Sequence, residues 1–417
     1  MSSYSDLTLA VTAQLSKQEK KEYGFFVTPP VIIDQLLTRI ETLGPFAQIL
    51  EPSCGTCEIV SVASRKFPEA TIVGIEYNNI VYDSIKHLAT DRIQLIHTDF
   101  INGTVPETYY DLIIGNPPYF VCPKEIVPKK YQPFMVGRPN MFGVFILRAL
   151  DLLATNGILA FVIPKSFMNA AFYNEIRKYI RDTCRIVSII DFEANNDFLD
   201  TDQATFGLIL QKNPEQKTDV SQYSIQLGDQ CIFTEDAERL RALFEGATTL
   251  KALGYAVKTG TVVWNQYKTP EEVAAGQKKK LTKLKTGDIS PLTDDATKTL
   301  LIYNTNIQDG SIVERTFSNA DKKQYIDLPG STETCIVVNR GNGNSAYNLT
   351  YALVEGRTYL VENHLNQILY DRPTGQPDYN SLLRSFRDPR TTEFLQRMIG
   401  NGGLSKTELE TILPIYL

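Results

Sequence analysis

The sequence predicts an α/β protein with a Rossmann-like, doubly wound and mostly parallel sheet, followed by a mixed α+β domain. Three observations predict this fold. Short apolar runs alternate with helix-like stretches through the first half of the 417 residues. Acidic or polar residues follow the ends of four of those runs. The alternation stops after Asn213, where short strands and turn signals take over.

Seven apolar runs in the first half have the length and composition of buried strands. They cover residues 47–50, 71–75, 93–96, 111–114, 158–163, 186–190 and 206–210. Residues 31–40, 143–153 and 171–181 lie between them and have apolar side chains at helical spacing. Strands that alternate with helices form a parallel sheet covered on both faces. Ligands of such sheets bind beyond the carboxyl ends of the strands.

The second half has a different pattern. Residues 235–243 predict a helix, and short strands separated by Gly and Asn turns dominate from Gly254 onward. Residues 379–398 predict one helical stretch before a polar turn and a last short helix. We therefore expect a domain boundary near residue 235, with one domain over residues 1–234 and another over residues 235–417.

Charge is unevenly distributed along the chain. The net charge is −6, but residues 235–417 carry 22 basic and 22 acidic side chains, so the acidity belongs to the first half. Residues 278–285 (KKKLTKLK) form a dense basic run in the neutral half. This run fits either a solvated loop or contact with phosphates.

Six scattered cysteines fit a reducing compartment better than a disulfide framework. Cys54 and Cys57 form a C-x-x-C pair, but no second pair follows at a spacing that suits zinc, so we expect no metal. The polar N-terminus lacks the apolar segment of a signal peptide, and no apolar run is long enough to span a membrane. We expect a soluble, cytoplasmic monomer.

The ends of three consecutive runs carry groups that suit a nucleoside. Glu51-Pro52-Ser53-Cys54-Gly55 follows the first run, and its small residues let the backbone turn tightly beside a ligand. Glu76 ends the second run, where a carboxylate can bond ribose hydroxyls. Asp99 follows the third and can accept from an adenine amino group, while Phe100 offers a flat apolar surface. No Gly-x-Gly-x-x-Gly cradle is present, so an adenosine cofactor without phosphates fits better than a dinucleotide.

Asn116-Pro117-Pro118-Tyr119 follows the fourth run and indicates the reaction. Prolines fix the backbone and lack N–H donors, so their carbonyls are free to face a ligand. The side-chain oxygen of Asn116 and the carbonyl of Pro117 can both accept from one NH₂ group, which localises the nitrogen lone pair. Tyr119 offers a stacking face for a planar substrate. Taken alone, the tetrapeptide also fits a structural turn.

With these motifs in this order, the sequence resembles the gamma-class, TaqI-like DNA adenine methyltransferases of restriction–modification systems. The resemblance covers nearly the whole chain and implies a class I methyltransferase sheet that binds S-adenosylmethionine. Residues 24–30 (GFFVTPP) look like the family's N-terminal cofactor motif. That likeness places Phe26 and Thr28 at the cofactor and implies that Thr28 closes over its methionine moiety.

The resemblance gives further residues a role. Residues 51–55 resemble the family's cofactor loop, Glu76 its ribose-binding acid, and Asp99-Phe100 the pair that binds the cofactor adenine. In the helix at 140–153, Phe145 stands where the family places an aromatic residue against the cofactor.

Two further positions in the first half bear on the resemblance to this family. Residues 197–204 resemble the loop whose Phe stacks on the extruded base, which implies that role for Phe198. One departure is Cys57, at a position where many members of the family have Gly.

Segments at 257–268, 301–307 and 359–366 resemble parts of the target-recognition domains in this group. Amide side chains with interleaved basic residues suit base-edge reading and phosphate contact. We expect Trp264 to pack in a core. The residues that we expect to contact DNA are Asn265, Gln266, Lys268, Lys278, Lys279 and Lys280.

The sequence thus predicts a site-specific DNA adenine-N6 methyltransferase. Residues 1–234 would form its catalytic domain and residues 235–417 its target-recognition domain. We expect double-stranded DNA as the partner, a flipped target adenine, and a cognate restriction endonuclease acting separately. Two alternatives stay open. Protein glutamine and ribosomal RNA methyltransferases share Asn-Pro-Pro-Tyr, although they typically lack a C-terminal domain of this size. A non-catalytic DNA specificity subunit would not need a complete cofactor crevice.

Overall fold

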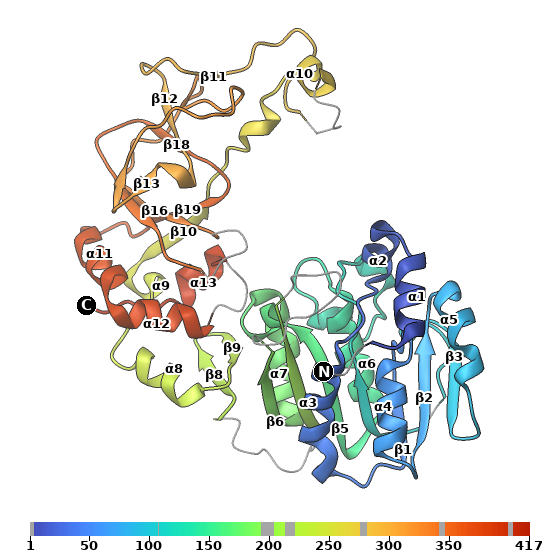
Figure 1. Ribbon diagram of the computed structural model, residues 1–417. Coiled ribbons are helices and arrows are strands. Elements are labelled where there is room, and N and C mark those ends of the chain that lie inside the picture. The colour runs from blue at the N-terminus through green and yellow to red at the C-terminus, as the bar shows by residue number, and fades with distance from the viewer. Residues whose placement is uncertain are drawn as a thin grey trace. The chain divides into compact units, whose positions relative to one another are not determined.

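The computed structural model describes residues 4–106, 108–192, 204–212, 222–275, 282–341, 347–398 and 403–417. The chain divides into two compact units, Met1–Arg239 and Leu240–Leu417 (Figure 1). In the part of the chain that is described, no helix is both long enough and apolar enough to cross a bilayer.

The first unit is built on a seven-stranded sheet with the order β3-β2-β1-β4-β5-β7-β6. Its strands are β1 Gln48–Glu51, β2 Thr71–Glu76, β3 Ile93–His97, β4 Tyr110–Gly115, β5 Leu153–Pro164, β6 Cys184–Asp191 and β7 Thr205–Lys212. The first five pair in parallel, and β7 runs antiparallel between β5 and β6. The prediction of a mostly parallel, doubly wound sheet is confirmed, and each of the seven predicted runs overlaps one of its strands.

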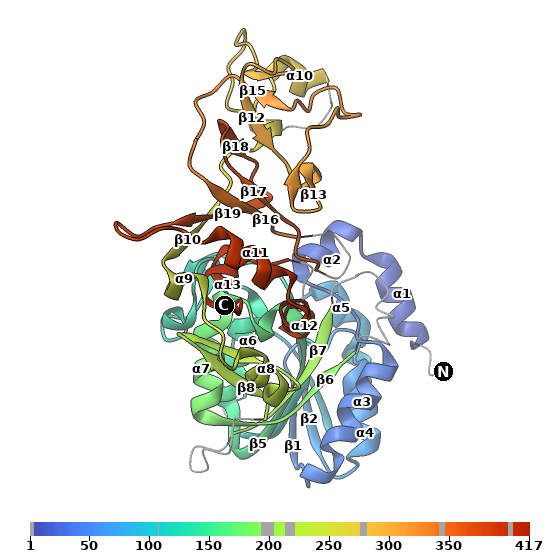
Figure 2. The same cartoon turned by 90° about the vertical axis from the view of Figure 1, so that its left-hand side faces the viewer.

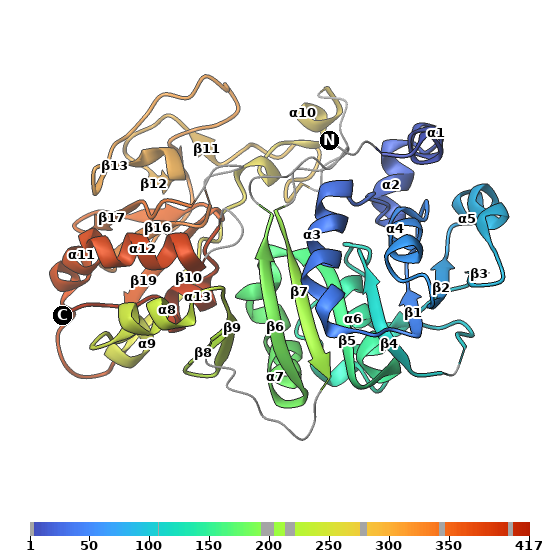
Figure 3. The ribbon, with the colours of Figure 1, turned by 60° about the horizontal axis from the view of Figure 1, so that its bottom comes forward.

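Helices cover both faces of this sheet, α3 and α4 on one face and α6 and α7 on the other (Figure 3). Side chains alternate between the faces along each strand, as the pleat requires. Ile49 packs with α3 and α4, whereas Leu50 packs with the α6 side. The helices of the unit are α1 Asp6–Gln14, α2 Lys17–Tyr23, α3 Pro30–Ile40, α4 Glu58–Lys66, α5 Asn79–Ile85, α6 Met141–Leu152 and α7 Asn174–Thr183. A hairpin of β8 (Ser224–Leu227) and β9 (Gln230–Phe233) packs against α7.

The second unit contains two four-stranded sheets. The larger, with the order β10-β19-β16-β17, is antiparallel (Figure 2). It comprises β10 Tyr255–Thr259, β16 Cys335–Asn339, β17 Tyr351–Val354 and β19 Leu365–Tyr370. The smaller, with the order β11-β15-β12-β18, comprises β11 Leu292–Thr293, β12 Thr299–Ile302, β15 Tyr325–Ile326 and β18 Tyr359–Val361. A short hairpin pairs β13 Ile307–Gln308 with β14 Ser311–Ile312.

Helices complete the second unit: α9 Leu250–Leu253, α10 Pro270–Ala275, α11 Tyr379–Arg387, α12 Pro389–Met398 and α13 Lys406–Thr411, while α8 Ala237–Phe244 spans the division between the units. Residues 379–398 are helical as predicted, but the stretch is divided in two, because α11 ends at Arg387 and α12 begins at Pro389. Proline disfavours helical backbone in the residue before it, and Asp388 is extended, with φ −64° and ψ 129°. The helix predicted from residue 171 begins at Asn174, after a single 3₁₀ turn.

Candidate active site

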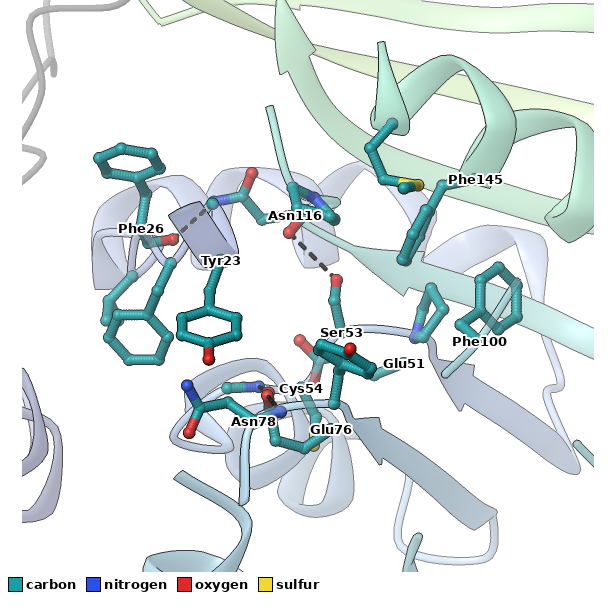
Figure 4. Close-up of a pocket in the computed structure, with 18 of the residues that line it drawn as sticks. Tyr23, Phe26, Glu51, Ser53, Cys54, Glu76, Asn78, Phe100, Asn116 and Phe145 are labelled. Carbon is teal, nitrogen blue, oxygen red and sulfur yellow. Dashed lines mark hydrogen bonds between the residues drawn. The ribbon is translucent and has the colours of Figure 1, made fainter. Parts of the chain in front are cut away.

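A cavity of about 380 Å³ lies at the carboxyl ends of β1, β2, β3 and β4 (Figure 4). This volume lies within the range of small-molecule sites. All eleven residues predicted to bind a cofactor line it, together with Asn116 and Pro118. The eleven are Phe26, Thr28, Glu51, Pro52, Ser53, Cys54, Gly55, Glu76, Asp99, Phe100 and Phe145.

Strand register brings these residues to one edge. β1 lies between β2 and β4 and pairs in parallel with both, with Glu51 opposite Gly74 and Leu50 opposite Ile113. Glu76, the last residue of β2, pairs with His97, the last residue of β3. The chain therefore leaves four adjacent strands at the same edge, where ligands of open α/β sheets bind.

The loop after β1 has a tight backbone. The N–H of Cys54 donates to the Ile75 carbonyl (2.8 Å), and that of Cys57 donates to the Cys54 carbonyl (2.7 Å). Gly55 and Cys57 both have left-handed backbone, with φ +49° and +65°. Glycine adopts this conformation at little cost, whereas other residues do so rarely. The backbone at Cys57 therefore has the conformation that favours the glycine found there in many members of the gamma class.

Two buried carboxylates face the cavity. Glu76 accepts from the N–H groups of Asn78 (2.6 Å) and Gly55 (3.0 Å), one to each oxygen. Glu51 has one carboxylate oxygen with no partner among the described residues. Burial raises the pKa of Glu51 well above its ordinary value of 4.5 and also raises the pKa of Glu76. A ligand with a positive charge or several donors would satisfy both groups.

An apolar wall closes another side of the cavity. The rings of Phe100 and Phe145 are both buried and lie 4.9 Å apart between centroids. Next to them, Asp99 accepts from the Ile101 N–H (2.8 Å) and from the Asn102 amide (3.2 Å). A flat ring system with a polar edge suits this combination of an apolar wall and a carboxylate.

Asn116 is fixed at three of its atoms. Its Nδ2 donates to the Phe26 carbonyl (3.0 Å), and its main-chain carbonyl accepts from Ser53 Oγ (3.1 Å) (Figure 4). Its Oδ1 accepts from the Tyr119 hydroxyl. The partners come from the N-terminal segment, the loop after β1 and the tetrapeptide itself, so the Asn116 amide has a fixed orientation.

The N-terminal segment 22–28 forms one wall of the cavity and packs directly on the tetrapeptide. Gly24 has φ +63°, and a Cβ added there would lie 2.6 Å from Pro118 Cβ and 3.1 Å from the Phe120 ring. Only glycine allows this approach. Position 24 therefore sets how closely residues 22–28 approach Asn116.

Tyr119 does not line the cavity. Its ring lies edge-on to Phe142, with centroids 6.0 Å apart, and its hydroxyl lies 2.8 Å from the Val162 carbonyl. Burial raises the pKa of the Tyr119 hydroxyl well above 10, so it is a protonated donor at neutral pH. Stacking of Tyr119 on a substrate stays a prediction. Pro117 is buried, and Phe198 lies outside the described residues.

Several lining residues were not predicted. Tyr77 follows Glu76 directly and lies 6.3 Å from Tyr23 between ring centroids. The sequence could have indicated Tyr77, because it directly follows Glu76, an acidic residue at the end of a predicted strand. Glu58, which also lines the cavity, accepts from Ser5 Oγ (2.7 Å) and Thr8 Oγ1 (2.6 Å) and so connects α1 to α4. Nothing in the local sequence indicates this contact across about fifty residues.

The predicted DNA-contact residues that can be placed lie in the second unit. Asn265 and Gln266 belong to a 3₁₀ turn with Trp264, and all three are partly exposed. Lys268 forms an ion pair with Asp321, and its Nζ lies 5.9 Å from the centre of the Trp264 ring. Trp264 packs against a small core, as predicted. Lys278, Lys279 and Lys280 lie outside the described residues. Among the residues that are described, no cluster could hold a metal ion.

The sheet order, with an antiparallel strand between β5 and β6 and a cavity at the carboxyl edge, defines a class I S-adenosylmethionine-dependent methyltransferase fold. Residues 31–198 match the family model described as Eco57I restriction-modification methylase. Over these residues the first unit is therefore similar to an Eco57I-type restriction–modification methylase domain.

Individual proteins are similar over longer stretches. The chain is 27% identical to the Type II methyltransferase M.CvrRI of Paramecium bursaria Chlorella virus XZ-6E, over all of both chains. It is 33% identical to the modification methylase CviBIII of Paramecium bursaria Chlorella virus NC1A, over 51% of this chain and 55% of that one. Among solved structures, the M protein of the Type I restriction enzyme EcoKI is 17% identical with a TM-score of 0.37, over 47% of this chain and 46% of that one.

We expect Gly24→Ala to loosen the N-terminal segment. Alanine at this positive φ costs about 1–2 kcal/mol, and its Cβ would also collide with Pro118. Amide hydrogen exchange over residues 23–28, measured by mass spectrometry, should become at least about tenfold faster. Gly228→Ala is the matched control, because Gly228 has φ +55° and nothing within 4 Å of an added Cβ. Equal exchange over residues 23–28 in both variants would contradict the proposed close packing.

Proposed function

We propose that this protein is a site-specific DNA adenine-N6 methyltransferase that uses S-adenosylmethionine. The single observation that carries the proposal is the fixed amide of Asn116, whose side chain borders a cavity suited to an adenosine-bearing cation. An amide oxygen at this place can accept a hydrogen bond from an exocyclic amine. This is the chemistry that an N6 methyltransferase requires.

The charges around the cavity support the choice of cofactor. Its lining contains five acidic residues and, among the described residues, no lysine or arginine. The acids are Glu22, Glu51, Glu58, Glu76 and Asp99. Phosphate groups would be repelled here, so nucleotides and dinucleotides fit poorly. S-adenosylmethionine has no phosphate and carries positive charge on its sulfonium and its ammonium, and its adenine suits the Phe100–Phe145 wall. When bound, it supplies a methyl group already activated by the sulfonium.

The residues of the chain then act on the substrate amine. The Asn116 side-chain oxygen and the Pro117 carbonyl accept its two N–H groups, and this draws the nitrogen lone pair out of conjugation with the base. The amine is itself the nucleophile, so no covalent bond to the enzyme forms. Flipping the adenine out of the duplex costs a few kcal/mol. Stacking on Tyr119 and Phe198 would offset about 1–3 kcal/mol for each ring.

The second unit and the relatives support double-stranded DNA as the substrate. M.CvrRI, named a Type II methyltransferase, aligns over the whole chain, including residues 240–417. A protein glutamine or ribosomal RNA methyltransferase would leave a unit of this size without a role. A specificity subunit would not need the complete cavity. We therefore assign residues 1–234 to catalysis and 235–417 to recognition of double-stranded DNA, with a separate endonuclease as the cognate partner.

We expect Asn116→Ala to abolish methyl transfer while cofactor affinity stays within a few-fold of wild type. Loss of a preorganised acceptor for the reacting group lowers the rate by at least about 100-fold. Single-turnover transfer of labelled methyl groups to DNA measures the rate, and calorimetric titration measures cofactor binding. Asn79→Ala is the control, because Asn79 is exposed and does not line the cavity. Activity of the Asn116 variant near the wild-type level would remove this residue from catalysis.

The pH dependence of cofactor binding tests the role of Glu51. Burial raises its pKa above 4.5, so ionisation destabilises the cofactor-free fold as pH rises through that raised value. A cationic ligand favours the ionised form, so affinity should fall as pH drops through that raised value. Glu51→Gln should weaken binding and flatten this profile, whereas Glu69→Gln, at an exposed position, should not change it. If Glu51→Gln shows the wild-type profile in calorimetry, Glu51 does not bind the cofactor.

In the second unit, we expect different residues to contact DNA phosphates and to read the base sequence. Lys→Gln changes at Lys278, Lys279 and Lys280 should weaken binding to all DNA alike and lower the salt slope by about 1 for each phosphate that is no longer bound. Asn265→Ala or Gln266→Ala should change the preference among sequences by about 1–3 kcal/mol. Competition binding with randomised duplexes at several salt concentrations measures both effects. The assignment is wrong if the lysine changes alter sequence preference and the amide changes do not.

A further inference from the structure

The hydroxyl of Tyr119 occupies a position that ring stacking does not require. It donates to Oδ1 of Asn116, and it also lies 2.8 Å from the main-chain carbonyl of Val162 on β5. Pairing between β4 and β5 ends at Gly115 and Phe161, one residue before Val162. The hydroxyl thus stands just beyond the end of the β4–β5 ladder, between a strand carbonyl and the side chain of Asn116.

The orientation of the Asn116 amide can be assigned from its neighbours. Its Nδ2 lies 3.0 Å from the carbonyl oxygen of Phe26, which can only accept. A flipped amide would place Oδ1 against that carbonyl, oxygen to oxygen, and is therefore excluded. With Nδ2 on Phe26, Oδ1 faces the Tyr119 hydroxyl, and Tyr119 must be the donor in that pair.

An amide oxygen has two acceptor sites, and the hydroxyl uses one of them. The other remains for an N–H of the substrate amine. A phenol has a single hydrogen, so Tyr119 can donate to Asn116 or to Val162 at any one time. The Val162 carbonyl lies 2.8 Å from the same hydroxyl and helps to fix the place of the hydroxyl beside Asn116.

We propose that Tyr119 is a positioning residue through its hydroxyl, which together with the Phe26 carbonyl holds the Asn116 amide with Oδ1 presented to the substrate amine. This role is separate from any stacking by the ring. It rests on the proposed function, since it concerns the residue that receives the amine. It also means that the N-terminal segment, which forms a wall of the cofactor cavity, takes part in orienting the amide that binds the second substrate.

Tyr119→Phe tests the proposal, because it keeps the ring and removes one oxygen. We expect the single-turnover rate constant for methyl transfer to fall about three- to tenfold, the loss that one hydrogen bond accounts for. Dissociation constants for S-adenosylmethionine and for target DNA should stay within about twofold. The fluorescence rise of 2-aminopurine at the target position, which reports flipping, should be retained. Tyr119→Ala, which also removes the ring, should lose both the rate and the fluorescence signal.

Tyr179→Phe is the matched control. Tyr179 packs against the same core, its ring lies 5.0 Å from Phe134, and it does not line the cavity, so removal of its hydroxyl should leave the rate unchanged. A wild-type rate in Tyr119→Phe would overturn the proposal. So would a loss of the flipping signal in that variant, because the hydroxyl would then act on the base and not on the amide. Wild-type protein that methylates no adenine would instead refute the proposed function, which keeps the two failures distinct.

Discussion

Parallel pairing of β1 with both β2 and β4 is the constraint on which the site depends. Parallel strands point their carboxyl ends to the same edge, and here that edge receives Glu51, Glu76 and Asn116 from three strands that are far apart in sequence. A shift of one residue in either pairing would send alternate side chains to the opposite face. The acids and the amide would then no longer face one cavity. Two apolar cores, one on each face of the sheet, fix this register.

Hydrogen bonds and close packing connect the residues proposed to bind the cofactor with Asn116, the residue proposed to bind the substrate amine. The segment 22–28 forms a wall of the cavity, lies against Pro118 through Gly24, and accepts from the Asn116 amide through Phe26. Ser53, from the cofactor loop, donates to the main chain of Asn116. The residues that would hold the cofactor and the residue that would receive the substrate amine therefore belong to one hydrogen-bonded assembly. Changes in the N-terminal segment should affect the amide without any direct contact with DNA.

Much of this arrangement could be predicted from the sequence, because it depends on local pattern. Buried strands show as short runs of β-branched residues, and the fold confines ligand-binding groups to the strand ends, so residues such as Glu76 and Phe100 were found from position alone. The helical stretch predicted over residues 379–398 is interrupted only at Asp388, where Pro389 disfavours the helical backbone that the apolar periodicity favours.

The contacts that orient Asn116 could not be predicted. Its bond to the Phe26 carbonyl joins residues 90 positions apart, and no side-chain pattern encodes a backbone acceptor. The close approach of Gly24 to Pro118 has the same origin in tertiary packing. The left-handed backbone at Cys57 was signalled only by comparison with glycine in related sequences.

The identity of the methylated base tests the central claim most directly. Unmethylated double-stranded DNA of mixed sequence would be incubated with the full chain and isotopically labelled S-adenosylmethionine, digested to nucleosides and analysed by mass spectrometry. The proposed site, in which the Asn116 oxygen and the Pro117 carbonyl would hold the amine of an adenine, predicts label in N6-methyladenine alone. Label in a methylated cytosine would contradict the assignment of the base, and the absence of label from every nucleoside would contradict DNA methylation itself.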